Sequence, residues 1–121
     1  MRRRDLLGPW GEALACEYLR GRGCRIVACN YRSRFGEIDV IAEDRKFLIF
    51  AEVKLRKSAE YGAAREFVDA RKQERLRQTA LLWLEGHETR LQPRFDVIEI
   101  YAPEGPESRN VSIRHIEDAF Q

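Results

Sequence analysis

The sequence contains few cysteines and no long apolar run. No apolar stretch approaches the roughly 18 residues needed to cross a bilayer, so a helical membrane protein is excluded. Residues 1–13 are basic at the start but have no apolar segment after the charges, which argues against a secretory signal. The three cysteines, Cys16, Cys24 and Cys29, have no CxxC spacing and no histidine nearby in the chain. We therefore expect neither a zinc site nor a disulfide framework, and a reducing cytoplasm is the expected compartment.

Other familiar signatures are also missing. The sequence has no internal repeat, no glycine-rich phosphate loop and no Ser-His-Asp or Cys-His spacing. His87 and His115 are isolated, and neither is assigned a chemical role. With 121 residues, of which 44% are hydrophobic and 35% charged, residues 1–121 are expected to form one globular domain.

Charge is distributed unevenly along the chain. Residues 1–57 contain 13 basic and 8 acidic residues, a difference of +5, whereas residues 99–121 have a difference of −3. The net charge of the whole chain is only +2. A basic leading half suits a polyanionic partner.

Two runs rich in β-forming residues, 36–42 and 46–54, predict an antiparallel hairpin. Alternation in the first run places Ile38, Val40 and Ala42 on one side, with Glu37, Asp39 and Ile41 on the other. In the second run one side carries Leu48, Phe50, Glu52 and Lys54, so charges enter an otherwise apolar side of the strand.

The register of this hairpin determines how close two acids come. A four-residue loop, 44–47, sets Asp39 directly opposite Glu52, whereas a two-residue loop, 44–45, leaves them diagonal. Their Cβ atoms would lie about 5 Å apart in the first case and about 7–8 Å apart in the second. Either separation fits one divalent cation, preferably Mg²⁺, and without a cation one carboxyl pKa should rise. Lys54 points the same way, and an ordinary cross-strand salt bridge is the alternative interpretation.

Helices are expected before and after the hairpin. An amphipathic helix is expected to start at Pro9 and to end at Gly21 and Gly23. Glu12 lies in its first turn. Its charge either is favourable at a helix N-terminus or makes Glu12 a third acid aimed at the hairpin. A second helix, 66–85, has an inward stripe interrupted by Lys72, which either extends past the sheet edge, the favoured interpretation, or points into the site.

The remaining segments are expected to be strands and loops. Residues 25–31 predict a strand ahead of the hairpin. Pro93 breaks the connection before a strand over 95–101, which can pair in parallel with the hairpin. A loop (102–110), a short edge strand (111–116) and a helical or frayed end follow.

The predicted order of helix, three strands, helix and strand resembles the core of the PD-(D/E)XK nuclease superfamily. More closely, the chain resembles the YraN-like family, uncharacterised bacterial proteins related to archaeal Holliday junction resolvases. The resemblance spans Gly8 to Tyr101 and rests on these motifs: Gly11-Glu12 with Tyr18-Leu19, Asn30 and Arg32, Gly36-Glu37-Ile38-Asp39, Glu52-Val53-Lys54 with Arg56, Lys72, Ala80 and Arg94-Phe95-Asp96-Val97. Ile38 stands where the superfamily name has proline.

This resemblance implies an α/β fold with a restriction-endonuclease-like αβββαβ core, in which helices flank a mixed central sheet. It implies that Asp39, Glu52 and the Val53 carbonyl bind Mg²⁺ or Mn²⁺, that Lys54 is catalytic, and that Glu12 is an additional acid. The implied activity is metal-dependent hydrolysis of DNA, with branched or structured DNA as a candidate substrate, by a homodimer. The residues expected to contact DNA phosphates are Arg32, Arg34, Arg56, Lys57 and Lys72.

Two other function classes remain open from the sequence. The chain could be a nucleic-acid-binding or adaptor module that keeps the fold without cutting, or a protein–protein module whose acids form a salt-bridged surface. The sequence does not distinguish DNA from RNA.

Overall fold

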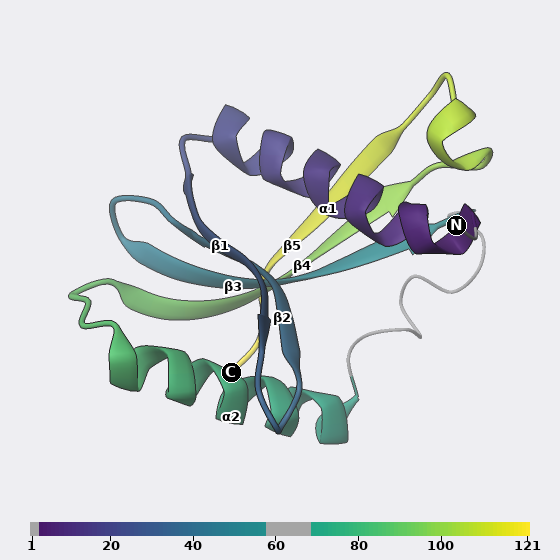
Figure 1. Cartoon of the computed structure of the whole chain (residues 1–121). Coiled ribbons are helices and arrows are strands. Elements are labelled where there is room, and N and C mark those ends of the chain that lie inside the picture. Colours follow the sequence, from purple (N-terminus) through teal and green to yellow (C-terminus); the bar gives the residue numbers. More distant parts are fainter. Residues whose placement is uncertain (1–2, 58–68) are drawn as a thin grey trace.

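The computed structural model describes residues 3–57 and 69–121, in which two helices lie on opposite faces of one sheet (Figure 1). In chain order the elements are α1 (Arg3–Gly21), β1 (Arg25–Arg32), β2 (Glu37–Glu43), β3 (Phe47–Arg56), α2 (Ala70–Gly86), β4 (Gln92–Tyr101), the 3-10 turn η1 (Gly105–Glu107) and β5 (Ser112–Phe120). The sheet order is β1-β2-β3-β4-β5, with β3 and β4 parallel and the other pairs antiparallel. This confirms the α/β class and the αβββαβ order.

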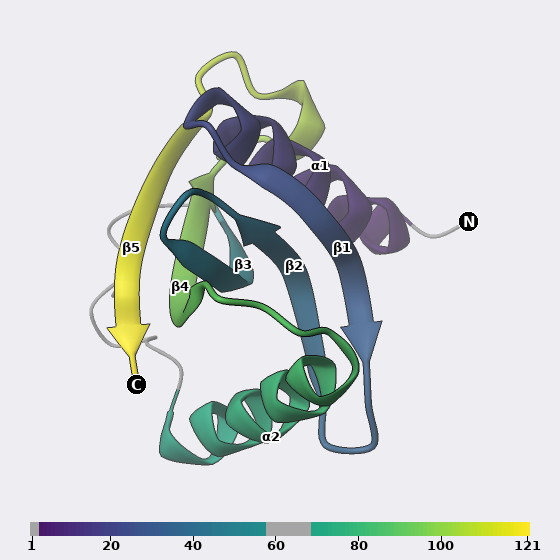
Figure 2. The ribbon, with the colours of Figure 1, turned by 90° about the vertical axis from the view of Figure 1, so that its left-hand side faces the viewer.

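Each face of the sheet has its own apolar core. Ala15, Cys16 and Leu19 of α1 pack on side chains such as Val40 and Ile98. On the other face, Leu76, Ala80 and Trp83 of α2 pack on a cluster of strand residues that includes Ile41, Leu48 and Phe50. Figure 2 shows α1 lying along β1 and α2 crossing the opposite side. The central strands β2, β3 and β4 are therefore covered on both faces over most of their length.

The β2–β3 hairpin adopts the four-residue register. Glu43 pairs with Leu48 and Val40 with Ala51. Asp44 fixes this turn, because its Oδ1 accepts hydrogen bonds from the backbone N–H groups of Lys46 and Phe47 at 2.8 and 2.7 Å. The pairing stops at Val40 and Ala51, one residue before Asp39 and Glu52 would face each other.

The predicted alternation in β2 is wrong at Ile38. Val40 and Ala42 pack in the α1-side core as expected, but Ile38 packs with Ile41 in the α2-side core. The pairing between β2 and β3 ends at Val40. The first part of β2 is therefore released from β3 and turns relative to the rest of the strand, so simple alternation fails at Asp39.

The first helix begins earlier than predicted. α1 starts at Arg3 and contains Pro9 in its interior rather than at its first position. Its end is as expected: Gly23 has φ 90, a conformation that glycine adopts without a Cβ clash, and its N–H bonds to the Arg20 carbonyl. Glu12 consequently lies in the third turn, so the helix-terminus explanation for its charge is wrong.

Three other boundaries differ from the predictions. α2 starts at Ala70, with Asp69 as its N-cap accepting from Lys72 N, and the predicted start at 66–68 lies outside the described residues. β4 begins at Gln92, so Pro93 belongs to the strand. β5 continues to Phe120, where a helical or frayed end was expected, because Ala119 and Phe120 pack against the α2-side core. Within residues 3–57 and 69–121, neither helix has an apolar stretch able to span a bilayer.

Candidate metal-binding site

Asp39 lies where β2 separates from β3. Its Oδ2 accepts a hydrogen bond from the Val53 backbone N–H at 2.8 Å. This bond replaces the ladder bond that a continuing hairpin would make, and it holds the carboxyl group in the gap between the two strands. The carboxyl group is thus positioned by the point at which the pairing stops.

Two more acids join Asp39 from the α1 side. Oxygens of Glu12, Glu37 and Asp39 all lie within 4.8 Å of one another. Asn30 orients the first of these acids, since its Nδ2 donates to Glu12 Oε1 at 2.7 Å. Asn30 has φ 54, a left-handed conformation that asparagine tolerates better than most residues. The structure therefore brings Glu12 to the hairpin, the second of the two predicted alternatives.

Glu52 approaches the same gap from the α2 side. Its side chain is about 10% exposed, and its Oε1 forms a hydrogen-bonded ion pair with Lys72 Nζ and lies 3.7 Å from Lys54 Nζ. The sequence favoured a Lys72 that extends past the sheet edge, and this prediction is wrong. Lys72 points into the site, because from the first turn of α2 its Nζ reaches Glu52 on β3.

Electrostatics link the two halves of the site. Burial, and then the charges of Glu52, Glu12 and Glu37, raise the pKa of Asp39 to about 6, against the opposing effect of the Val53 N–H. The residues around Asp39 thus favour its protonated form. Excess negative charge at one half-buried carboxyl group is what a cation would neutralise.

The two lysines respond differently to Glu52. Burial lowers the pKa of Lys54, and the neighbouring charge of Lys72 adds to this effect although Glu52 opposes it. Burial alone would lower the pKa of Lys72, but its hydrogen bond to Glu52 outweighs burial and raises the pKa. Lys72 is therefore the main counter-ion of Glu52. For Lys54, the charge of Glu52 does not outweigh the effect of burial on the pKa.

The donor set fits a hard divalent cation. Carboxylate oxygens are preferred by Mg²⁺ and Mn²⁺, and Glu12, Glu37 and Asp39 offer three within one coordination sphere. The raised pKa of Asp39 supplies the electrostatic reason for a cation to bind there.

Sequence comparisons place the chain in a family. A model of the uncharacterised protein family UPF0102 matches residues 11–100. The chain belongs to the UPF0102 family. It is 44% identical over 117 residues to the UPF0102 protein of Rhodococcus jostii, covering 94% of this chain and 95% of that protein. It is also 42% identical over 118 residues to the protein of Pelotomaculum thermopropionicum, covering 97% of each chain.

UPF0102 membership confirms the YraN-like resemblance. The matched range contains Glu12, Asp39, Glu52 and Lys54. The family description carries no activity, so a chemical role for these residues has to be argued from their arrangement.

The predicted phosphate-binding residues of this UPF0102 protein have different surroundings. Arg32 is 77% exposed and lies 3.6 Å from Glu37, and Lys57 is exposed. Arg34 is exposed above the Phe35 ring, at 4.8 Å from its centroid. The Arg56 side chain is only 13% exposed and donates to Glu99 at 3.3 Å. Arg56 is thus positioned as an internal counter-ion, unlike the three exposed residues.

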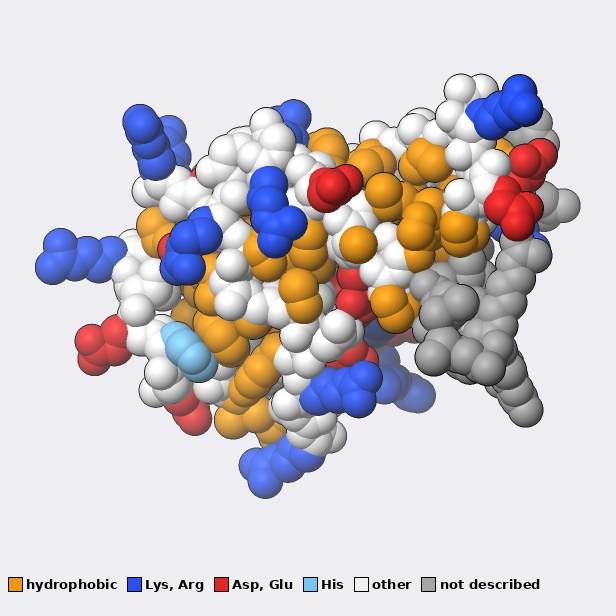
Figure 3. Space-filling model, turned by 45° about the horizontal axis from the view of Figure 1, so that its top comes forward, with side chains coloured by type: hydrophobic (Ala, Val, Ile, Leu, Met, Phe, Trp, Pro, Cys, Tyr) orange, Lys and Arg blue, Asp and Glu red, His pale blue; other side chains and the backbone are white. Residues whose placement is uncertain are grey.

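Side chains of both charges lie close together on one face of the molecule. Figure 3 shows acidic side chains recessed between an apolar area and a group of basic side chains.

Sequence reasoning missed one member of the site, Glu37. It was assigned no role, although it lies two residues before Asp39 on the same strand and alternation puts both on one side. That spacing was the signal that could have identified Glu37 as a third ligand.

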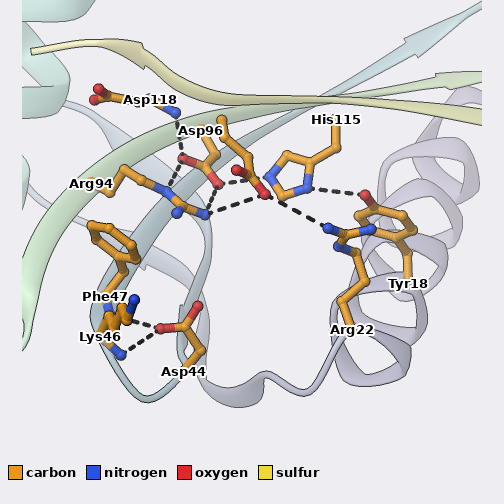
Figure 4. A network of polar contacts seen from close by, with 10 residues as sticks. Tyr18, Arg22, Asp44, Lys46, Phe47, Arg94, Asp96, His115 and Asp118 are labelled. Carbon is orange, nitrogen blue, oxygen red and sulfur yellow. Dashed lines mark hydrogen bonds and ion pairs between the residues drawn. The ribbon is translucent and has the colours of Figure 1, made fainter.

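A second buried polar cluster has no counterpart in the predictions (Figure 4). His115 Nε2 contacts Asp96 Oδ2 at 2.6 Å, and its Nδ1 contacts the Tyr18 hydroxyl at 3.0 Å. Arg94 donates to both oxygens of Asp96 at 2.9 Å each, and the Asp118 N–H donates at 3.0 Å. Burial would raise the pKa of Asp96, but these donors lower it. This cluster joins β4, β5 and α1 and is fully satisfied.

Proposed function

We propose that this UPF0102 protein is a metal-dependent endonuclease that hydrolyses DNA phosphodiester bonds. The observation that supports this most is the position of Asp39, which is bonded to the N–H of Val53, the residue after Glu52, and whose pKa is raised by burial and by the charge of Glu52. Lys54 Nζ lies 3.7 Å from Glu52. Paired carboxylates with an adjacent amine can bind a cation and a phosphoryl group at one place. A surface salt bridge would not need four acids around a half-buried position.

In the proposed site, Asp39 and Glu52 would hold Mg²⁺ or Mn²⁺, with the Val53 carbonyl as a further ligand. Bound Mg²⁺ would polarise the phosphate and lower the pKa of a coordinated water. Glu12 and Glu37 add negative charge beside Asp39 and keep the cation in the gap. Asn30 fixes the orientation of Glu12 by its hydrogen bond.

The lysines act on the substrate. Lys54 lies close enough to Glu52 to be held in place, and its ammonium group stabilises charge that develops on the phosphoryl oxygens. Lys72 neutralises Glu52 in the protein alone and can transfer its ion pair to a DNA phosphate when a cation takes its place. Arg32, Arg34 and Lys57, which are exposed, hold the DNA backbone without reading sequence.

The size of the domain bears on its assembly. A domain of 121 residues covers little of a branched DNA, so we expect a homodimer to cut two strands of such a substrate.

A second candidate function is a nucleic-acid-binding module that does not cut. It is favoured by the contact between Lys72 and Glu52, which already neutralises one proposed metal ligand without a cation. In this case the exposed bases bind DNA or RNA, and the acids serve only the fold.

Cleavage assays separate these candidates. Labelled linear, nicked, flapped and four-way DNA, and an RNA strand, are incubated with Mg²⁺ or Mn²⁺. We expect Asp39→Asn and Glu52→Gln to reduce cleavage at least about 10³-fold while binding to the same DNA changes little. Glu43→Gln is the matched control, because Glu43 lies on the same strand but pairs with Arg25. Equal cutting by wild type and both site variants would contradict the proposed function, and no cutting by wild type would favour the binding module.

A further inference from the structure

Two of the three cysteines lie next to each other although they are 13 positions apart in the chain. Cys16 in α1 and Cys29 in β1 have their Sγ atoms 3.7 Å apart. A disulfide bond is about 2.05 Å long, so the two sulfurs need to approach by roughly 1.7 Å. The spacing of these cysteines gave no sign of this contact, since β1 turns back along the helix only in the folded chain.

The two thiols differ in accessibility. Cys29 is exposed, whereas Cys16 is 6% exposed and packs in the α1-side core. Burial and the contact with Cys29 raise the pKa of Cys16 to about 11. A soluble oxidant therefore meets Cys29 first, with Cys16 behind it as a second thiol.

We propose that Cys16 and Cys29 are a site of reversible oxidation, at which a peroxide forms a disulfide bond between α1 and β1. The Cys29 thiolate attacks one oxygen of hydrogen peroxide, the O–O bond breaks, and hydroxide leaves, giving a sulfenic acid on Cys29. The Cys16 sulfur then attacks the Cys29 sulfur, and the sulfenic oxygen leaves as water with the Cys16 proton. Overall, two thiols lose two electrons and two protons, and the peroxide becomes two water molecules.

The oxidation site lies beside the acid cluster. Glu12 precedes Cys16 by four residues, so both side chains lie on the same face of α1. Asn30 follows Cys29 directly and donates to Glu12. A bond between the cysteines therefore ties together the two elements that position Glu12. Any effect of this tie on catalysis rests on the proposed function, but the disulfide bond itself does not.

Peptide mapping tests the oxidation site directly. The whole chain is treated with stoichiometric hydrogen peroxide, alkylated without reduction, digested and analysed by mass spectrometry. We expect a loss of 2 Da, a cross-linked pair of peptides containing Cys16 and Cys29, and recovery of both free thiols after dithiothreitol. The cross-link should also raise the melting temperature by about 5 °C or more, because it closes a loop in the unfolded chain.

Variants make the assignment specific. Cys24→Ser should keep the cross-link, whereas Cys29→Ser, at an exposed position, should abolish it without loss of the far-UV circular dichroism spectrum. Asp39→Asn should oxidise like wild type, so that failure of the nuclease proposal would leave this result unchanged. A cross-link through Cys24, dimers joined by Cys29, or conversion of Cys29 to sulfinic acid with Cys16 still reduced would overturn the proposal.

Discussion

Asp39 is a half-buried acid and Asp96 a buried acid on one sheet, and their pKa values shift in opposite directions. The pKa of Asp39 is raised to about 6, whereas the pKa of Asp96 is lowered. Burial pushes both upward. The difference therefore comes from the groups that each part of the molecule places around its carboxylate.

The two carboxylates have neighbours of opposite kinds: hydrogen-bond donors and a cation around Asp96, and acids around Asp39. Asp96 accepts from Arg94, His115 and the Asp118 backbone, and its side chain has no exposed surface. Asp39 has one hydrogen bond in the described part of the chain, from Val53, and acids as neighbours. The first cluster contains its own cations, whereas the second has excess negative charge that a bound cation can neutralise.

This comparison distinguishes a structural carboxylate from a functional one. The hydrogen bonds of the Asp96 cluster connect β5 and α1 to β4, so they stabilise the folded state. The acids around Asp39 repel one another, which costs folding energy and is reasonable only if a ligand recovers it. The same substitution should therefore have opposite effects at the two positions.

The largest effect is expected from Asp96→Asn. This change removes the charge that Arg94 and His115 face and leaves a buried cation without its partner, so we expect the free energy of unfolding to fall by about 3–5 kcal/mol at pH 7. Because the pKa of Asp96 is lower in the folded protein, the stabilisation is present above about pH 4 and is lost as the pH falls. Urea denaturation measures both. A loss under about 1 kcal/mol would contradict the structural role.

A smaller effect of opposite sign is expected from Asp39→Asn. The folded protein holds the Asp39 proton up to a pKa of about 6, so the free energy of unfolding falls as the pH rises from about 4 to 6 and stays lower above it. Removing this carboxylate should raise the free energy of unfolding by about 1–3 kcal/mol at pH 8, without added metal. The difference in the free energy of unfolding between the variant and the wild type should disappear below about pH 4. A variant less stable than wild type at pH 8 would show that the acids do not repel.

Much of the fold could be predicted because it rests on local signals. The hairpin, the helix ends at glycine and the parallel strand after α2 are all encoded by nearby residues. The hairpin register was not determined by the pattern, since both even loops keep Asp39 and Glu52 on one face. The side-chain hydrogen bonds of Asp44 to two backbone N–H groups fix the longer loop.

The sequence predicted most of the residues of the site but not how they contact one another. Lys72 was recognised as an interruption of an apolar stripe, but its contact with Glu52 joins α2 to β3 only in the folded chain. His115 and Asp96 are 19 residues apart, and the cysteine pair joins two elements with no shared motif. Contacts of this kind depend on tertiary packing, which periodicity does not describe.

The central claim is that the acids around Asp39 form a cation site, and carboxyl titration by NMR tests it most directly. The side-chain carboxyl carbons of Asp39 and Asp96 are followed against pH, with and without saturating Mg²⁺. We predict that Asp39 titrates near pH 6 without the cation and below about pH 4 with it, while Asp96 stays low in both. An Asp39 titration that Mg²⁺ leaves unchanged would contradict the account.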